Sequence, residues 1–172
     1  DGVTTNPSLM AKEGIKGQQN ILNHYLAICD IVKGDVSAEV LSTDFEGMIK
    51  VGTELAALHP QIVVKVPVIK DGIKAIKYFS DHGIRTNCTL VFNQGQALLA
   101  AKAGAAYVSP FVGRLDDNAT DGMELIRQIV DMFNYYEFPT QVLAASIRHT
   151  MHIIKCIEYG ADVATCPLSA IV

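Results

Sequence analysis

The sequence contains no uninterrupted apolar stretch approaching about 18 residues, the length that a membrane-spanning helix requires. It also has no run of like charges, and a formal net charge of −4 provides no basic surface for nucleic acid or an anionic membrane. Neither Gly-x-Gly-x-x-Gly nor a P-loop occurs, so nothing indicates a nucleotide. These absences predict a soluble protein that binds neither nucleic acid nor a membrane.

Cysteine is scarce, and Cys29, Cys88, Cys156 and Cys166 lie far apart without forming a Cys-x-x-Cys pair. We interpret them as reduced thiols of a cytoplasmic protein, because disulfides persist mainly in oxidising compartments. The spacing His149-x-x-His152-x-x-x-Cys156 could place three metal ligands along one helical face, but it lacks a carboxylate or a further cysteine. Capping and packing of a helix is the simpler interpretation, so no metal site is predicted.

What the chain does have is apolar content: 49% of its 172 residues are hydrophobic, enough to fill the core of one domain. Short apolar segments alternate with amphipathic segments of helix length, a pattern typical of a parallel β/α fold. Helices are expected over Gln18–Lys33, Asp44–His59 and Asp121–Tyr136, the second of them capped by Ser42-Thr43. The predicted strands are Gly2–Asn6, Asp35–Val40, Ile62–Pro67, Thr86–Val91, Ala106–Val112, Gln141–Ile147 and Asp162–Pro167.

Side-chain alternation favours a barrel over a doubly wound sheet, the other fold that fits this order. One parity of the strands is apolar, including Val36, Ala38, Val64, Val66, Cys88, Leu90, Phe92, Val108 and Val112. The opposite parity carries Thr4, Asn6, Ser37, Glu39, Lys65, Asn87, Thr89, Ser109, Phe111, Ala144, Ser146 and Arg148. Helices cover both faces of a doubly wound sheet and would leave these polar groups buried without partners, whereas a barrel gathers them inside. We therefore predict an α/β fold of the (β/α)8 TIM barrel class.

A barrel needs eight strands, and typical examples run to about 250 residues. We expect residues 1–172 to form a single barrel domain that is incomplete at the N-terminus, and also at the C-terminus if a closing helix follows Val172. The chain opens at Asp1 without a methionine and directly as a strand, so the first barrel strand would lie upstream.

Lys65 is the most unusual residue, because it interrupts the apolar strand Ile62–Pro67. Lysine is almost never fully buried without a partner, and burial lowers the pKa of an amine until it can attack a carbonyl and form a Schiff base. The alternatives are a lysine whose amine reaches solvent at the strand end, or a structural ion pair. Glu39 and Thr89 on the neighbouring strands would share its cavity, where Glu39 could move protons directly or through a water held by Thr89. Glu39 could instead serve only to neutralise the lysine.

Arg114 and Arg148 follow the ends of adjacent late strands. Barrels often bind phosphate on these loops, and the guanidinium fork suits its geometry. Each arginine alone is more often part of a surface salt bridge, but the pair favours a phosphorylated substrate.

Six segments together resemble the transaldolase family, in its small bacterial form. They are Asp1-Gly-Val-Thr-Thr-Asn-Pro-Ser-Leu9, Val36-Ser-Ala-Glu-Val40, Ile62-Val-Val-Lys-Val-Pro67, Asn87-Cys-Thr-Leu-Val-Phe92, Ser109-Pro-Phe-Val-Gly-Arg114 and Ala144-Ala-Ser-Ile-Arg148. The resemblance implies a cofactor-free transferase of the pentose phosphate pathway. It would carry a dihydroxyacetone unit from fructose 6-phosphate or sedoheptulose 7-phosphate to an aldose phosphate.

By position, the resemblance implies that Lys65 forms the Schiff base and that Glu39 and Thr89 handle a catalytic water. It assigns Thr4, Asn6, Asn87 and Ser109 to the substrate hydroxyls, and Arg114, Ser146 and Arg148 to the phosphate. An aspartate on the family's first barrel strand assists C–C cleavage, and no residue of this sequence matches it. Small members of the family assemble into pentamers or decamers, so a homo-oligomer is expected.

A subgroup of the family, fructose 6-phosphate aldolase, releases free dihydroxyacetone. The pattern of that subgroup has glutamine at the position of Glu39 and tyrosine at the position of Phe111. By resemblance, both residues of this sequence therefore favour transfer. A tyrosine hydroxyl can protonate the bound enamine, whereas phenylalanine cannot. A barrel that binds phosphosugars without catalysis, or an inactive fragment, remains the second alternative.

Overall fold

The computed structural model describes residues 1–172, and its strands form one curled parallel sheet in chain order. Each strand pairs in parallel with the next along the chain. The strands are β1 (Val3–Thr4), β2 (Val36–Glu39), β3 (Ile62–Pro67), β4 (Thr86–Val91), β5 (Tyr107–Pro110), β6 (Gln141–Ala144) and β7 (Val163–Ala164). All seven predicted strands are present, and the curled sheet is that of a TIM-barrel-like α/β fold.

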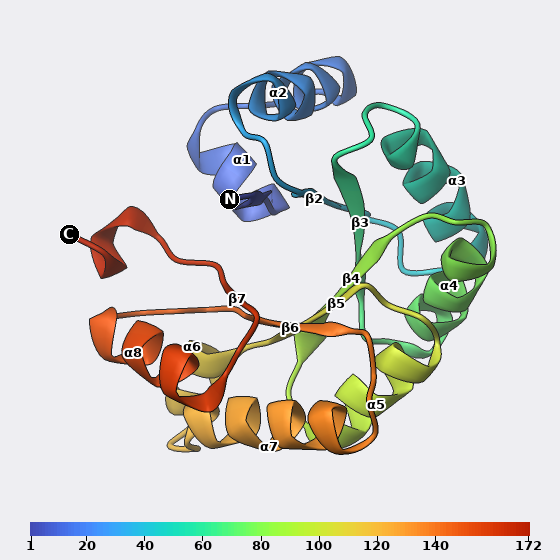
Figure 1. Cartoon of the computed structure of the whole chain (residues 1–172). Coiled ribbons are helices and arrows are strands. Elements are labelled where there is room, and N and C mark those ends of the chain that lie inside the picture. Colours follow the sequence, from blue (N-terminus) through green and yellow to red (C-terminus); the bar gives the residue numbers. More distant parts are fainter.

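The helices lie on the outer side of the curled sheet (Figure 1). They are α1 (Pro7–Lys12), α2 (Gln18–Ile31), α3 (Phe45–Ala56), α4 (Lys70–Asp81), α5 (Gln94–Lys102), α6 (Val112–Asp116), α7 (Gly122–Tyr135) and α8 (Thr150–Tyr159), followed by a 3-10 turn over Leu168–Ala170. The predicted cap of α3 is wrong by one residue, because Asp44 accepts the hydrogen bond from Gly47 N at 2.9 Å. None of the helices has the length and apolarity that crossing a membrane requires.

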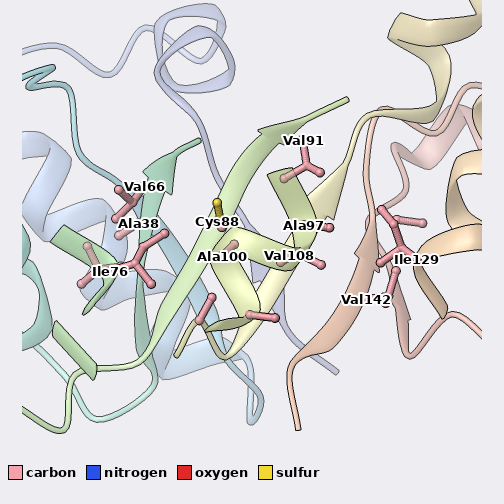
Figure 2. Close-up of a cluster of buried hydrophobic side chains, with 14 of the residues drawn as sticks. Ala38, Val66, Ile76, Cys88, Val91, Ala97, Ala100, Val108, Ile129 and Val142 are labelled. Carbon is pink, nitrogen blue, oxygen red and sulfur yellow. The ribbon is translucent and has the colours of Figure 1, made fainter. Parts of the chain in front are cut away.

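The hydrophobic core lies between the sheet and these helices. Figure 2 shows its centre, where Ala38, Val66, Cys88 and Val108 of the strands lie near Ile76 of α4, Ala97 and Ala100 of α5, and Ile129 of α7. All of these side chains are fully buried. A buried valine or isoleucine contributes roughly 1.5–3 kcal/mol, so this outer layer supplies the main stabilisation of the sheet. The prediction that one strand parity packs against helices is confirmed for these residues.

The alternation predicted for the end of β4 is wrong. A register shift occurs between Cys88 and Val91, and Leu90 has a φ of 61°, in the left-handed region. The extra residue turns Leu90 outward to 41% exposure and puts Val91 into the core (Figure 2). Phe92 is likewise exposed and does not pack under the helices. A bulge resets the alternation of a strand, which strict period-two counting cannot anticipate.

The parity predicted for β6 is also wrong. Leu143 pairs with Val163 of β7, and Gln141 pairs with Tyr107, which is itself aligned with Asn87. Leu143 therefore faces the interior, whereas Val142 and Ala144 belong to the helix-covered core. Each parity of the predicted strand Gln141–Ile147 contains one polar residue, Gln141 or Ser146, among apolar ones, so alternation carries little information about its orientation. Ser146 lies beyond the end of the strand, so strand parity does not apply to it.

Candidate active site

Lys65 and Glu39 meet inside the curled sheet. They are aligned on the adjacent strands β3 and β2, and Lys65 Nζ lies 3.1 Å from Glu39 Oε2. Lys65 also donates a hydrogen bond to the carbonyl oxygen of Thr5 at 3.3 Å. Their side chains are only 9% and 18% exposed. The structure thus brings together the amine and the carboxylate that side-chain parity placed in one cavity.

This arrangement satisfies the charge of the lysine without using all of its hydrogens. An ammonium has three donors, and two are directed to Glu39 and to Thr5. Transfer of one proton from Lys65 to Glu39 would leave an uncharged amine beside an uncharged acid, both already in contact. The contact thus places a proton acceptor directly against the amine.

Thr89 is the buried hydroxyl of the next strand, β4. Its Oγ1 atom is fully enclosed and has no hydrogen-bond partner in the protein. A buried hydroxyl without a partner costs about 1–3 kcal/mol. Thr89 immediately precedes Leu90, whose positive φ forms the bulge. Thr86 Oγ1, on the same strand, is likewise buried without a partner, so it is the inward parity shared with Lys65 and Asn87 that makes Thr89 the site candidate.

A chain of buried hydrogen bonds crosses the floor of the site. Asn87 Nδ2 donates to Ser37 Oγ at 3.1 Å, and Ser109 Oγ donates to Asn87 Oδ1 at 2.7 Å. Asn87 and Ser109 were singled out by the sequence, whereas the contribution of Ser37 was missed. The inward parity of Ser37 in the sequence was the signal that could have identified it as a site residue. Because the network orients the Asn87 amide, it also fixes the donors and acceptors offered to a ligand.

Thr4 and Asn6 occupy the first strand and the turn after it. Thr4 Oγ1 is 2.5 Å from Thr165 Oγ1, which links the β1 end of the sheet to the segment after β7. Asn6 caps α1, its Oδ1 accepting from Leu9 N at 2.9 Å. Its Nδ2 makes no hydrogen bond within the protein, so Asn6 has donors left for a ligand.

The two predicted phosphate-site arginines lie on neighbouring segments with different surroundings. Arg114 is exposed on α6 and forms no ion pair. Arg148, after β6, is also exposed, and its Nη2 donates to Asp117 Oδ2 at 2.6 Å. The surface salt bridge weighed for each arginine thus exists for Arg148. Such a pair is worth about 0–1 kcal/mol, and four other N–H donors of the guanidinium remain for an anion.

Two aromatic rings stand at the carboxyl ends of β4 and β5. Phe92 and Phe111 pack edge to face, with their ring centres 5.8 Å apart. Phe111 is half-buried and pairs with Ala145 in an isolated bridge. The contact of Phe92 with this ring was missed, because the predicted parity directed Phe92 toward the helices.

Tyr25 of α2 is a further neighbour that the sequence did not reveal. Burial raises the pKa of its phenol, and the negative charge of Glu39 acts in the same direction.

The curled parallel sheet, with helices outside it and a buried lysine–carboxylate pair inside it, defines a TIM-barrel-like α/β protein with a candidate active site. The chain matches the family model described as "Transaldolase/Fructose-6-phosphate aldolase" over residues 1–172. It is 77% identical over 171 residues to the "Probable transaldolase" of Parabacteroides distasonis, and 75% identical to that of Porphyromonas gingivalis. Each alignment covers 99% of this chain and 78% of the relative.

The chain therefore belongs to the transaldolase/fructose-6-phosphate aldolase family, as its motifs indicated. Family membership supports an enzyme with a transaldolase-like function.

Proposed function

We propose that this protein is a transaldolase that transfers a dihydroxyacetone unit from a ketose phosphate to an aldose phosphate through a Schiff base on Lys65. The observation that carries the proposal is the contact of 3.1 Å between Lys65 Nζ and Glu39 Oε2 in a largely enclosed site. The proposed substrate class, sugar phosphates, is supported by membership of a family that includes transaldolases and a fructose 6-phosphate aldolase.

In the first step, the uncharged amine of Lys65 attacks the C2 carbonyl of the ketose, for which fructose 6-phosphate is the proposed donor. Glu39 returns a proton to the carbinolamine oxygen, which leaves as water and produces the protonated imine. The free hydroxyl of Thr89 can hold that water. No metal is needed for this step, because the positive imine nitrogen itself withdraws electrons.

In the second step, the imine draws electrons from the neighbouring C3–C4 bond. A base takes the proton of the C4 hydroxyl, the C3–C4 bond breaks, the aldose phosphate leaves as an aldehyde, and a three-carbon enamine stays attached to Lys65. The family's first-strand aspartate would be that base, and no residue of this sequence matches it. Asn87 and Ser109, held by the buried network, are suited to bind its hydroxyls. An acceptor aldose phosphate then forms a new C–C bond, and hydrolysis frees Lys65.

Phe111 favours transfer over release of free dihydroxyacetone. It contacts Phe92 through an apolar edge and has no hydroxyl with which to protonate the enamine. The bound fragment is then expected to wait for an acceptor aldehyde. Arg148 and Arg114 are the proposed ligands of the substrate phosphate, with Ser146 between the strand end and Arg148.

The decisive experiment is borohydride reduction in the presence of fructose 6-phosphate, followed by peptide mapping. The proposal predicts a stable adduct on Lys65 and no adduct on exposed lysines. If the protein is folded and binds phosphate but forms no adduct on Lys65, the result would favour the alternative of a barrel that binds phosphosugars without catalysis. Addition of erythrose 4-phosphate distinguishes the two activities of the family: dihydroxyacetone released independently of the acceptor would identify an aldolase.

A further inference from the structure

The loop between β6 and α8 has a strained conformation that other segments must hold in place. Ser146 adopts a φ of 59°, in the left-handed region that non-glycine residues rarely occupy. Its carbonyl oxygen accepts a hydrogen bond from Gly113 N at 3.0 Å, at the start of α6. A side chain at position 113 would collide with Ser146 O and with the side chain of Arg148. The loop is thus pressed against α6.

His152 holds the other end of the same loop. It lies in the first turn of α8, its side chain is only 8% exposed, and its Nδ1 accepts a hydrogen bond from the backbone N–H of Arg148 at 3.3 Å. Because Nδ1 accepts, the ring proton of neutral His152 is on Nε2. Nε2 lies 3.0 Å from Asp116 Oδ2 and donates to it.

Asp116 is itself fixed, because its Oδ1 accepts from Gly122 N at 3.0 Å, at the start of α7. The next residue, Asp117, bonds the guanidinium of Arg148 directly. Two adjacent carboxylates at the end of α6 therefore restrain Arg148 at two points. Asp117 restrains its side chain, and Asp116 restrains its backbone through His152.

We propose that His152 is a positioning residue for phosphate binding: with Asp116 behind it, His152 holds the backbone of Arg148 so that the guanidinium is oriented before the substrate arrives. This inference rests on the proposed function, in which Arg148 binds the substrate phosphate. Restraining a flexible cationic side chain in advance reduces the entropy lost on binding. His152 itself has no contact with the reacting carbons, so its effect belongs in KM and not in kcat.

Two conservative substitutions separate the two ring nitrogens. In His152→Asn, the amide oxygen takes the place of Nδ1 and can still accept from Arg148 N. In His152→Gln, the amide nitrogen takes the place of Nε2 and can bond Asp116, but no acceptor remains beside Arg148. We expect His152→Gln to raise KM for fructose 6-phosphate about five- to tenfold, the effect of one lost hydrogen bond, with kcat changed less than about twofold.

His152→Asn should restore KM to within about threefold of the wild type. The matched control is His149→Gln. His149 is exposed, and its ring is tilted by 45° against that of His152 with the ring centroids 3.8 Å apart, but it bonds neither Arg148 nor Asp116. Gly113→Ala provides a second route if His152→Gln fails to fold. It displaces the same loop from the α6 side and should also raise KM selectively.

Two readouts separate this inference from the proposed function. Calorimetric binding of inorganic phosphate reports the anion site without catalysis, and borohydride trapping with unphosphorylated dihydroxyacetone reports Lys65 without the anion site. Phosphate binding weakened in His152→Gln, with trapping intact, would support the inference. Equal phosphate affinity in all variants, or equal losses in the Asn and Gln variants, would overturn it. Absence of trapping in the wild type would overturn the proposed function, while phosphate calorimetry still decides the role of His152.

Discussion

Lys65 Nζ lies 3.1 Å from Glu39 Oε2, and parallel register places the two residues side by side on β3 and β2. Because both side chains are mostly shielded from water, their attraction is stronger than that of an exposed pair. The same contact serves structure and chemistry, since the carboxylate that neutralises the ammonium is also placed to exchange a proton with it. Three consequences concern this site and its walls, and a fourth concerns the histidine behind Arg148.

Replacement of Lys65 by methionine should abolish the borohydride adduct and reduce transfer activity by at least ~10³-fold, because the covalent step loses its nucleophile. Methionine approximates the length of the lysine stem, so the strand can remain packed. Peptide mapping and a coupled assay measure the two effects. Lys70→Met, at an exposed position on α4, is the matched control and should keep both adduct and activity. An adduct elsewhere in the Lys65→Met variant would contradict the assignment.

Thr89→Val should lower kcat by about 10²-fold, within the range for lost proton-transfer assistance, without destabilising the protein. The hydroxyl has no protein partner to lose, so its removal also relieves an unsatisfied buried group. Urea unfolding and steady-state kinetics measure the two quantities. Thr89→Ser keeps the hydroxyl and should retain most of the activity. A large loss of stability in Thr89→Val would show that the hydroxyl is structural.

Phe111→Tyr should increase the share of donor that appears as free dihydroxyacetone at the expense of transfer. The new hydroxyl, at the end of β5, would supply a proton to the enamine that phenylalanine cannot supply. Product analysis with and without erythrose 4-phosphate measures the ratio. Phe92→Tyr, on the partner ring, is the control for a hydroxyl added at the same aromatic pair. If the ratio of free dihydroxyacetone to transfer product is unchanged in Phe111→Tyr, this residue does not determine whether the fragment is released or transferred.

The stability of the protein should fall as pH drops below 6.5, partly because of His152. Burial lowers the pKa of His152 from its ordinary 6.5, and the positive charges of His149 and Arg148 act with burial, whereas Asp116 opposes them. The fold therefore favours the neutral ring. This contribution is complete above pH 6.5 and is lost as pH falls toward the lowered pKa, because the unfolded chain binds the proton more readily.

Urea unfolding above and below pH 6.5 tests this sign when the wild type is compared with His152→Asn, which cannot titrate. The wild type should lose more unfolding free energy on acidification than the variant does. The His149→Asn variant, which removes the neighbouring histidine and keeps His152, is the control for titration elsewhere in the loop. A steeper loss in the His152→Asn variant than in the wild type would reverse the assignment.

Much of the fold was predictable because its signals are local. Each β/α unit carries an apolar strand and an amphipathic helix, and Lys65 stands out against its own strand. Errors arose where a local rule was interrupted or uninformative. The bulge at Leu90 reset the alternation, and around β6 each parity carries one polar residue among apolar ones, so neither parity stood out.

The sequence by itself determined the parallel β/α organisation, the inward lysine and the family, because strand alternation and short motifs are written in consecutive residues. Only the tertiary structure decided which partners those residues have. The contact of Asp117 with Arg148 joins residues 31 apart in the sequence, and that of Asp116 with His152 joins residues that are farther apart still. Such contacts depend on how the helices pack around the sheet, and no local pattern records them.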